Sequence, residues 1–539
     1  PAMSERAPLL PSDAENGDYG SLPPPPQDEE ITIIGKEISF PRLMVILSTT
    51  WLGVFLAAAD TTVIATLSAE ISSDFSSLSL LSWLATSYLI ATAASQPISG
   101  RLTDIFGRGP GLVFSNIAFA AGNLICGLAT SQQAILIGRV IAGIGGGGLL
   151  SIPMFLGSDL VPLRRRAMIS GFGNIWFGSG TMVGAVFGGI LNDRTSLGWR
   201  MAFLVQVPPA LLSAVIVHFL IKVPPKQSDK SYIKRIDFAG VFLVTSFMTT
   251  LVLGLSVGGN TVPWTHPLPI ACISLSGCLF AGFVYWELRV SQPIIPIRLL
   301  QSRTVFGSCL ASMFCAAIAL TSVFYIPLYL QARGDSPTDA GLKIVPASLG
   351  AAVGGLVPGF MIKRTGKYVG LAISCLIALI VGTFMFVLQD SETATWMTCV
   401  AFFVASIGYN ATFNITQTAC IAAVDHSNQA VVTSIGHLAR SLGGTIGITL
   451  ASVVYQSSLS TSLWARFGDQ PNAAEEIQRI RDDLTELKRL PHGWYPGVLE
   501  SLMTAFGHVW LVMLAWAILA LVGISPIQQH RLYSTLERK

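Results

Sequence analysis

Three ionisable residues stand inside long apolar stretches of the sequence: Asp60, Arg139 and Arg440. If these stretches enter a membrane, each charge costs about 2.5 to 3.5 kcal/mol, so such residues are expected to be functional. We predict that Asp60 and Arg139 lie in the same leaflet, where pairing offsets part of their desolvation. The pair could be a fixed structural ion pair or a switch in which protonation of Asp60 frees or recruits Arg139, and we favour the switch.

Polar and aromatic side chains on two other stretches could contact a solute. Asn410, Asn414 and Gln417 follow one another at i, i+4 and i+7, which places them on one stripe of a helix. Tyr325 and Tyr329 likewise share one helical face. The amide stripe either lines a path for a solute or hydrogen-bonds neighbouring helices, as amides inside membranes do.

Arg440 lies in the middle of an apolar stretch, one helical turn from His437. Its guanidinium could bind a carboxylate or hold two helices together, and we favour the structural role. His437 could titrate near neutral pH, or it could be a hydrogen-bonded packing residue. We favour packing for a single histidine of this kind.

A short charged segment, 100–108, joins two long apolar stretches. It contains Arg101, Asp104 and Arg108, which no bilayer interior would accept, so it is predicted to be a tight turn on the cytosolic face. The segment 359–367 follows a later apolar stretch in a similar way. This weak internal symmetry indicates two related halves.

The elements that must position these residues are membrane helices. Of 539 residues, 51% are hydrophobic and 12% are charged, and the mean hydropathy is +0.61, so the charges are too few to solvate a globule. Helical spans need about 20 apolar residues. We expect an all-α membrane protein with fourteen spans, near 43–67, 78–100, 111–130, 134–158, 168–191, 201–222, 238–259, 268–287, 304–331, 340–362, 368–389, 396–422, 430–455 and 503–525.

The distribution of basic residues predicts the orientation. An even number of spans puts both termini on one side, and most of the 33 Lys and Arg fall on that side. Cytosolic loops carry the excess of Lys and Arg, so both termini are predicted to be cytosolic. The eight cysteines lie inside predicted spans and are interpreted as packing residues, with no disulfide framework.

The predicted organisation is six spans, two extra spans and six more. The expected segments are a disordered cytosolic tail at 1–40, a six-helix bundle at 41–222, a basic cytosolic linker at 223–237, two extra spans at 238–302, a second six-helix bundle at 303–526 with a lumenal loop at 456–502, and a cytosolic tail at 527–539. In that loop, Ile477, Ile480, Leu484 and Leu487 recur at helical spacing. They predict a short amphipathic helix, most simply an inert cover.

Five segments resemble the major facilitator superfamily, and four of them resemble ordered motifs of its fourteen-span drug:proton antiporter branch. The turn at 100–108 is similar to the signature loop of the superfamily, and 55–66 is similar to the first-span motif of the branch, with Asp60 at its acidic position. Further resemblances lie at 136–145, which contains Arg139, at 180–189, and at 198–203 followed by Pro208. Ala185 departs from the branch, whose drug exporters have Pro there. Gly180, Gly184 and Gly188 are interpreted as close-packing residues.

The resemblance implies a mechanism and a set of roles. The spans 1, 4, 9 and 12 would line a central cavity, with substrate contacts from Asp60, Tyr325, Tyr329, Asn410, Asn414 and Gln417. Asp60 and Arg139 would couple transport to protons. Arg101, Asp104 and Arg108 would form a charge latch at the cytosolic rim, and Arg440 would be structural.

The whole pattern is most similar to the fungal vacuolar basic amino acid transporters. This implies a proton-coupled antiporter that moves small cationic solutes from the cytosol into the vacuole by alternating access. A multidrug or siderophore antiporter at the plasma membrane is the alternative, and a nutrient receptor without transport is a third interpretation. No constellation of His, Cys and carboxylates indicates an enzyme, a metal or a cofactor, no Walker pattern indicates ATP, and nothing indicates nucleic acid.

The N-terminal tail contains a possible sorting signal. Glu5 stands four residues before the pair Leu9 and Leu10, which resembles the acidic dileucine address that adaptors read on the way to vacuoles. This pattern favours the vacuolar membrane over the plasma membrane. A chance match in a disordered tail is the alternative.

Overall fold

The computed structural model describes thirteen stretches of the chain. They are 39–75, 78–161, 163–221, 237–258, 262, 264–290, 297–335, 337–390, 392–424, 429–470, 472–482, 490–491 and 493–530. Within them the regular structure is helical, and the sole strand-like feature is an isolated bridge between Gly258 and Val262. The predicted tails and the basic linker lie largely outside these stretches, as do Glu5, Leu9 and Leu10.

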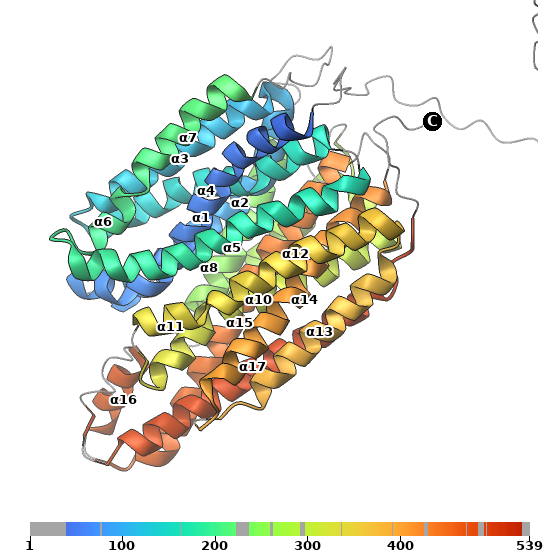
Figure 1. Cartoon of the computed structure of the whole chain (residues 1–539). Coiled ribbons are helices and arrows are strands. Elements are labelled where there is room, and N and C mark those ends of the chain that lie inside the picture. Colours follow the sequence, from blue (N-terminus) through green and yellow to red (C-terminus); the bar gives the residue numbers. More distant parts are fainter. Residues whose placement is uncertain are drawn as a thin grey trace, which may run out of the picture.

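The first half of the chain forms a bundle of antiparallel helices (upper left in Figure 1). We call this bundle the N-terminal half. Its helices are α1 (Phe40–Asp74), α2 (Leu78–Phe106), α3 (Arg108–Gly127), α4 (Gln132–Leu160), α5 (Leu163–Arg194), α6 (Trp199–Leu204) and α7 (Val207–Leu220).

The second half of the chain forms another bundle, the C-terminal half, which lies beside the first (Figure 1). Its elements are a 3-10 turn η2 (Ile297–Gln301), α10 (Arg303–Ala332), α11 (Pro337–Lys343), α12 (Val345–Thr365), α13 (Val369–Val387), α14 (Thr395–Ala422), α15 (Gln429–Phe467), α16 (Ala473–Asp482) and α17 (Tyr495–Ile524). The two halves meet along α5 and α12 and along α2 and α15.

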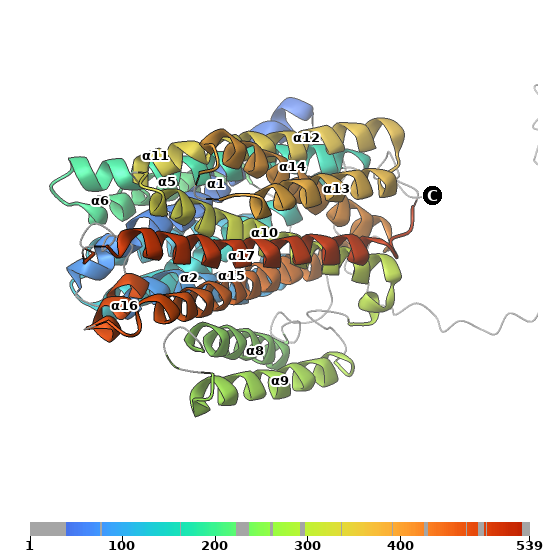
Figure 2. The same ribbon diagram turned by 90° about the horizontal axis from the view of Figure 1, so that it is seen from below.

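A helical hairpin lies beside the two bundles. It consists of α8 (Phe238–Val257) and α9 (Pro267–Glu287), which pack on each other, and α8 also touches α2 and α15 (Figure 2). The hairpin therefore sits at one seam between the halves, and its outer helix α9 is largely exposed on the outside.

Twelve helices in the described stretches are long and apolar enough to cross a membrane, which confirms the all-α membrane fold. The predicted number of fourteen is not confirmed. The predicted spans 78–100 and 238–259 form α2 and α8, which are not among the twelve. The search covers only the described residues, and within α8 it finds the shorter apolar helix Ala239–Leu255. Gln96 of α2 lines the interior cavity described below.

Proline divides two of the predicted spans. The span 201–222 is split into α6 and α7, and the span 340–362 into α11 and α12. Pro208 and Pro346 stand in the first turn of α7 and of α12. Proline has no N–H and a fixed φ, so it fits the start of a helix and interrupts its middle.

The long loop predicted at 456–502 is shorter than expected, because α15 continues to Phe467 and α17 begins at Tyr495. The apolar pattern weakens after Tyr455, whereas the helix itself continues with more polar residues to Phe467. The predicted amphipathic helix is present as α16, and Ile477 and Ile480 are buried against the C-terminal half. This burial agrees with a cover, while Leu484 and Leu487 lie outside the described residues.

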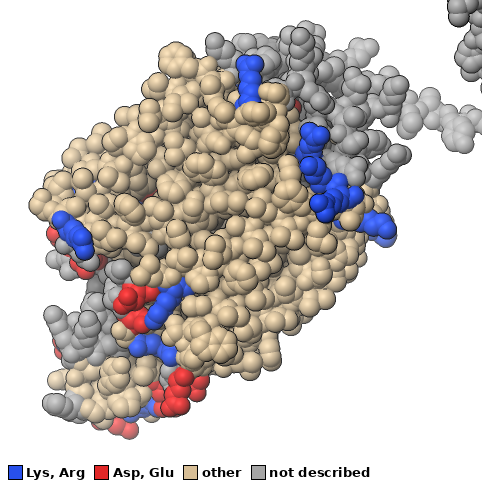
Figure 3. Space-filling model, in the orientation of Figure 1, with Lys and Arg blue, Asp and Glu red and all other residues tan. Residues whose placement is uncertain are grey.

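Charged side chains gather toward the two ends of the molecule. Figure 3 shows an uncharged band between these ends on the face it presents, as expected of a surface that contacts lipid. α1 begins and α17 ends at the same end of the bundle, and α16 lies at the opposite end (Figure 1). The described part of the chain therefore begins and ends at the same end of the bundle.

Candidate functional site

A cavity of about 350 Å³ lies between the two halves. The predicted spans 1, 4, 9 and 12, now α1, α4, α10 and α14, all contribute side chains to it. Four further helices, α2, α5, α12 and α15, complete the wall. Both halves line the cavity, so a rotation of one half against the other would change its shape and its access.

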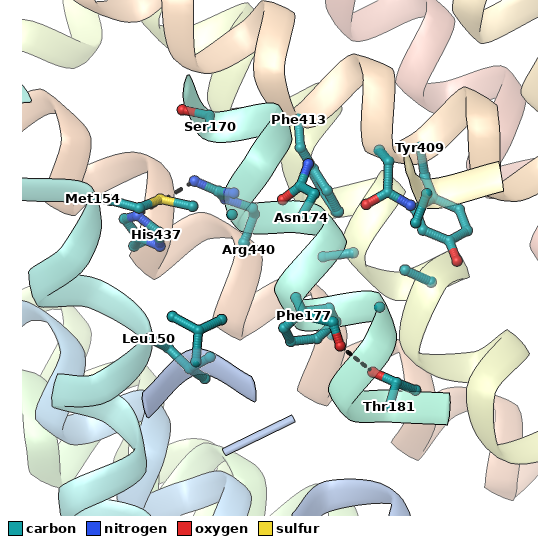
Figure 4. A pocket seen from close by; sticks show the side chains of 18 of the residues that line it. Leu150, Met154, Ser170, Asn174, Phe177, Thr181, Tyr409, Phe413, His437 and Arg440 are labelled. Carbon is teal, nitrogen blue, oxygen red and sulfur yellow. Dashed lines mark hydrogen bonds between the residues drawn. The ribbon is translucent and has the colours of Figure 1, made fainter. Parts of the chain in front are cut away.

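The wall of the cavity is mostly apolar and aromatic, with a few amides (Figure 4). Aromatic rings come from both halves: Trp51, Tyr88, Phe177, Phe402, Tyr409 and Phe413. The amides are Gln96, Asn174, Asn410 and Gln417. Arg440 is the one charged side chain apart from His437 among these lining residues, and they include no Asp or Glu. An apolar cavity with a few polar groups is typical of a small-molecule site.

Asp60 and Arg139 form a buried ion pair, as predicted. Arg139 Nη1 donates to Asp60 Oδ2 at 2.7 Å, and the side chains of Arg139 and Asp60 are 1% and 0% exposed, respectively. Arg139 Nε also donates to the carbonyl of Leu84 at 3.2 Å. The other carboxylate oxygen, Asp60 Oδ1, is buried and has no hydrogen-bond partner among the described residues. An acceptor in this state is costly, and a proton bound there would remove its charge.

Tyr88 separates this ion pair from the cavity. Its ring lies 4.3 Å from the Arg139 guanidinium and also belongs to the cavity wall, and its hydroxyl donates to the carbonyl of Ala57 at 3.4 Å. Asp60 itself is not among the lining residues, although its neighbour Thr61 is. In this conformation a solute in the cavity therefore meets the face of Tyr88 and not the carboxylate of Asp60.

The two predicted tyrosines lie deeper in the C-terminal half than expected. Tyr325 packs edge-on against Tyr455, with ring centroids 5.5 Å apart. Tyr329 donates to the carbonyl of Asp390 at 3.1 Å and packs against Phe506. Neither belongs to the cavity wall in this conformation. They do share one helical face, but that face is turned toward α15 and α17.

The predicted amide stripe of α14 divides between two environments. Asn410 and Gln417 line the cavity. Asn414 is buried, and its Nδ2 donates to the carbonyl of Gly355 at 3.3 Å, which ties α14 to α12. The stripe thus has both roles that the sequence left open: Asn410 and Gln417 line the cavity, and Asn414 bonds a neighbouring helix.

Arg440 projects from α15 into the cavity wall (Figure 4). Its Nη2 donates to Gln417 Oε1 at 2.6 Å and lies 3.5 Å from His437 Nε2. The guanidinium also lies 5.3 Å from the ring centroid of Phe413. It makes no ion pair with a described residue, in contrast to Arg139. The sequence favoured a structural role, and the bond to Gln417 does join α14 and α15, but the side chain also faces the interior of the cavity.

At the end of the bundle near the termini, Arg108 is held by residues of the N-terminal half. Its Nε donates to Asp159 Oδ2 at 2.9 Å and its Nη1 to Thr103 Oγ1 at 2.6 Å, and it lies over the ring of Phe155. Asp159 was missed by the sequence analysis, because an acid at the end of a span looks like an ordinary surface charge. The side chains of Arg101 and Asp104 lie outside the described residues.

Three glycines of α5, interpreted above as close-packing residues, contact α1. A Cβ atom on Gly180 or Gly184 would collide with the backbone of Phe55 or Ala59, and one on Gly188 would meet the hydroxyl of Thr66 at 2.7 Å. Small residues at such positions let two helix backbones approach closely. This contact fixes the segment of α1 that carries Asp60.

Comparison with known proteins settles the family. The family model for the Major Facilitator Superfamily matches residues 50–448. The chain belongs to the major facilitator superfamily. It is therefore a transporter rather than an enzyme.

Relatives and solved structures of the superfamily agree with this assignment. The chain is 34% identical to the multidrug resistance protein fnx1 of Schizosaccharomyces pombe, over 92% of this chain and 94% of the relative. It is 30% identical to the vacuolar membrane amino acid uptake transporter fnx2 of the same organism, over 85% and 80%. Its fold is similar to that of a bacterial homolog of the human lysosomal transporter Spinster, with a TM-score of 0.62 and 17% identity over 92% and 100% of the two chains.

Proposed function

We propose that the protein is a proton-coupled antiporter that moves cationic amino acids from the cytosol into the vacuole by alternating access. The observation that carries this proposal is the buried pair of Asp60 and Arg139 behind the wall of a cavity shared by two halves. A titratable acid in this place can exchange a proton while the cavity exchanges a solute. The relative named for vacuolar amino acid uptake supports the direction and the solute class.

Coupling would act through the charge of Asp60. A proton on the unpartnered Oδ1 would neutralise the carboxylate and weaken its hold on Arg139. Arg139 lies under the ring of Tyr88, so a shift of the guanidinium would move a residue of the cavity wall. In the opposite step, binding of a cationic solute above Tyr88 would favour loss of that proton, because like charges repel.

The proton gradient supplies enough energy for this exchange. Each pH unit across the membrane provides about 1.4 kcal/mol per proton. Each 100 mV of membrane potential provides about 2.3 kcal/mol per charge. A vacuole that is acidic by two units could therefore drive accumulation of the solute by about two orders of magnitude per proton.

The cavity suits a cation even without a carboxylate in its wall. Aromatic faces attract cations, with about 0.5 to 2 kcal/mol for each contact. Tyr88, Trp51 and Tyr409 offer such faces, and Asn410 offers an amide oxygen.

A second candidate function is export of drugs or siderophores across the plasma membrane. The large share of apolar and aromatic side chains in the cavity wall favours it, and so does the name of the relative with 34% identity. The dileucine pattern at Leu9 and Leu10 supports the vacuole instead. Replacing both leucines by Ala should shift a fluorescent fusion to the plasma membrane, and unchanged vacuolar location would remove this support.

Transport by the purified full chain in liposomes tests the proposal. With an acidic interior, labelled arginine, lysine or histidine should accumulate, and a protonophore should abolish the accumulation. Asp60→Asn should lower this uptake about tenfold or more, because the amide cannot carry the proton. The matched control is Asp74→Asn, since Asp74 pairs with Arg200 at 3.0 Å on the exposed surface.

Two results would overturn the proposal. Full proton-driven uptake by Asp60→Asn would remove Asp60 from the coupling mechanism. Exchange of a lipophilic cationic dye for protons, with no uptake of any of the three amino acids, would replace the proposal by the drug-export function.

A further inference from the structure

Arg139 and Arg440 both lie within apolar helices, and they differ in whether an anionic side chain pairs with the guanidinium. Arg139 is compensated by the carboxylate of Asp60 at 2.7 Å. Arg440 donates to a neutral amide, lies 3.5 Å from a histidine ring nitrogen and makes no ion pair with a described residue. A guanidinium in a low-dielectric site gains most from an anionic partner with two oxygens.

No described residue pairs its charge with Arg440, and the side chain of Arg440 faces the cavity. Figure 4 shows Arg440 at the wall, with His437 and Met154 on one side and Asn174 and Phe413 on the other. The lining residues include no Asp or Glu. Since the described residues of the cavity wall do not supply the anion, a solute that enters the cavity can supply it.

We infer that Arg440 and Gln417 form a subsite that binds the carboxylate of the transported amino acid. This inference rests on the proposed function and specifies its substrate class: the solute must carry a carboxylate as well as its cationic side chain. Gln417 Oε1 accepts from Arg440 Nη2 and so orients the plane of the guanidinium. The carboxylate binds the guanidinium edge that faces the cavity, and the cationic side chain extends toward the aromatic residues of the wall.

The subsite also lies on an element that takes part in contact between the halves. Ser441, the next residue of α15, donates a hydrogen bond to Gln96 of α2, and His437 packs edge-on against Phe155 of α4 at 6.2 Å between ring centroids. A carboxylate bound at Arg440 therefore touches the same helix that joins the two halves. Occupancy of the subsite can bias how these halves pack.

Equilibrium binding without a proton gradient tests the subsite. The purified full chain in detergent would be titrated with arginine, with argininamide, which replaces the carboxylate by a neutral amide, and with agmatine, which lacks it. Arginine should bind about tenfold or more tightly than either analogue, because the charge-assisted pair is lost. Arg440→Gln should reduce this preference to about one, since the remaining groups do not distinguish the three ligands.

A second variant guards against misfolding of Arg440→Gln. Gln417→Glu places a carboxylate beside the guanidinium and keeps it paired, so the protein should stay folded while the preference for arginine is lost. Arg466→Gln is the matched control, because Arg466 pairs with Glu500 at 2.6 Å on the surface of the C-terminal half and lies outside the cavity wall. It should leave the preference unchanged.

The outcomes separate this inference from the proposed function. Equal binding of arginine and agmatine by the natural chain, together with proton-driven arginine uptake, would overturn the subsite and leave the function. The expected preference without proton-driven uptake would overturn the function and leave the subsite. If arginine, lysine and histidine all fail to bind, both are overturned. If folded Gln417→Glu retains the preference, the subsite is also overturned.

Discussion

At the scale of single residues, the buried pair of Asp60 and Arg139 should contribute strongly to stability. Removing one partner leaves the other charge buried and unpaired, which costs about 3 to 5 kcal/mol. We therefore expect Asp60→Ala to lower the melting temperature of the purified protein clearly, and the double variant Asp60→Ala with Arg139→Met to recover most of the loss.

The exposed pair of Asp74 and Arg200 provides the comparison for this prediction. Its side chains are 45% and 32% exposed, respectively. Solvent screens such a pair, and it contributes about 0 to 1 kcal/mol. Equal losses for Asp60→Ala and Asp74→Ala would contradict the view that burial sets the cost.

Tyr88 is predicted to block proton movement between the cavity and Asp60 while Asp60 and Arg139 form their ion pair. Tyr88→Ala would open a path between the cavity and Asp60, so liposomes without solute should leak protons faster than with the natural chain. Tyr88→Phe keeps the ring over Arg139 and loses only the 3.4 Å bond to Ala57, so its leak should stay low. A pH-sensitive dye inside the liposomes measures the proton leak of both variants. A leak through Tyr88→Ala as slow as that of the natural chain would contradict the role of the ring.

The sequence predicted some of these residues and not others, for physical reasons. Asp60 and Arg139 were predictable because charges inside a span are rare and need each other. Tyr88 was not, because an aromatic residue in a span is ordinary. Tyr325 and Tyr329 were correctly placed on one face, but periodicity does not say whether a face turns toward a cavity or toward the core of a bundle.

At the scale of helices, the contact of α5 with α1 depends on the lack of a side chain at Gly184. Gly184→Ala would place a Cβ against the backbone of Ala59, and overpacking of this kind costs about 1 to 3 kcal/mol. We expect a lower melting temperature and weaker proton coupling, because this part of α1 carries Asp60. The control is Gly277→Ala in α9, where no atom apart from the adjacent backbone of α9 itself lies within 4 Å of the new Cβ.

Gly277→Ala should leave the melting temperature unchanged or slightly raised, since Ala is the better helix former. A similar loss for both variants would show that helix propensity and not close packing dominates.

Most helices were predictable from apolar length, but their ends and breaks were not. The continuation of α15 to Phe467 depends on helical hydrogen bonds beyond the apolar region, which hydropathy does not report. The breaks before α7 and α12 are caused by Pro208 and Pro346, which stand in the first turn of each of these helices. These prolines are visible in the sequence, but apolar length alone does not report them.

At the scale of the whole molecule, alternating access requires the two halves to move along the contact of α5 with α12. A Cβ on Gly178 would lie 3.6 Å from the Cβ of Ala351, within the range of about 3.5 to 4.5 Å that a disulfide needs. In the variant Gly178→Cys with Ala351→Cys, oxidation should cross-link the halves and stop solute uptake.

The reduced form of the same variant is its own control. A reductant should restore uptake by the cross-linked protein. Cleavage at a protease site engineered into the linker at 223–237 would show whether a disulfide still joins the two halves. Full uptake by fully cross-linked protein would contradict a movement along this contact.

The position of the hairpin of α8 and α9 limits how it could be gained or lost during evolution. α8 begins and α9 ends at the same end of the bundle (Figure 2). The insertion of this hairpin between the halves therefore does not reverse the direction in which the helices of the second half run. A single inserted helix would have turned α10 to α17 upside down and destroyed the shared cavity. Gene rearrangements can therefore add or remove α8 and α9 together, but not one of them alone, without disturbing how the two halves enclose the cavity.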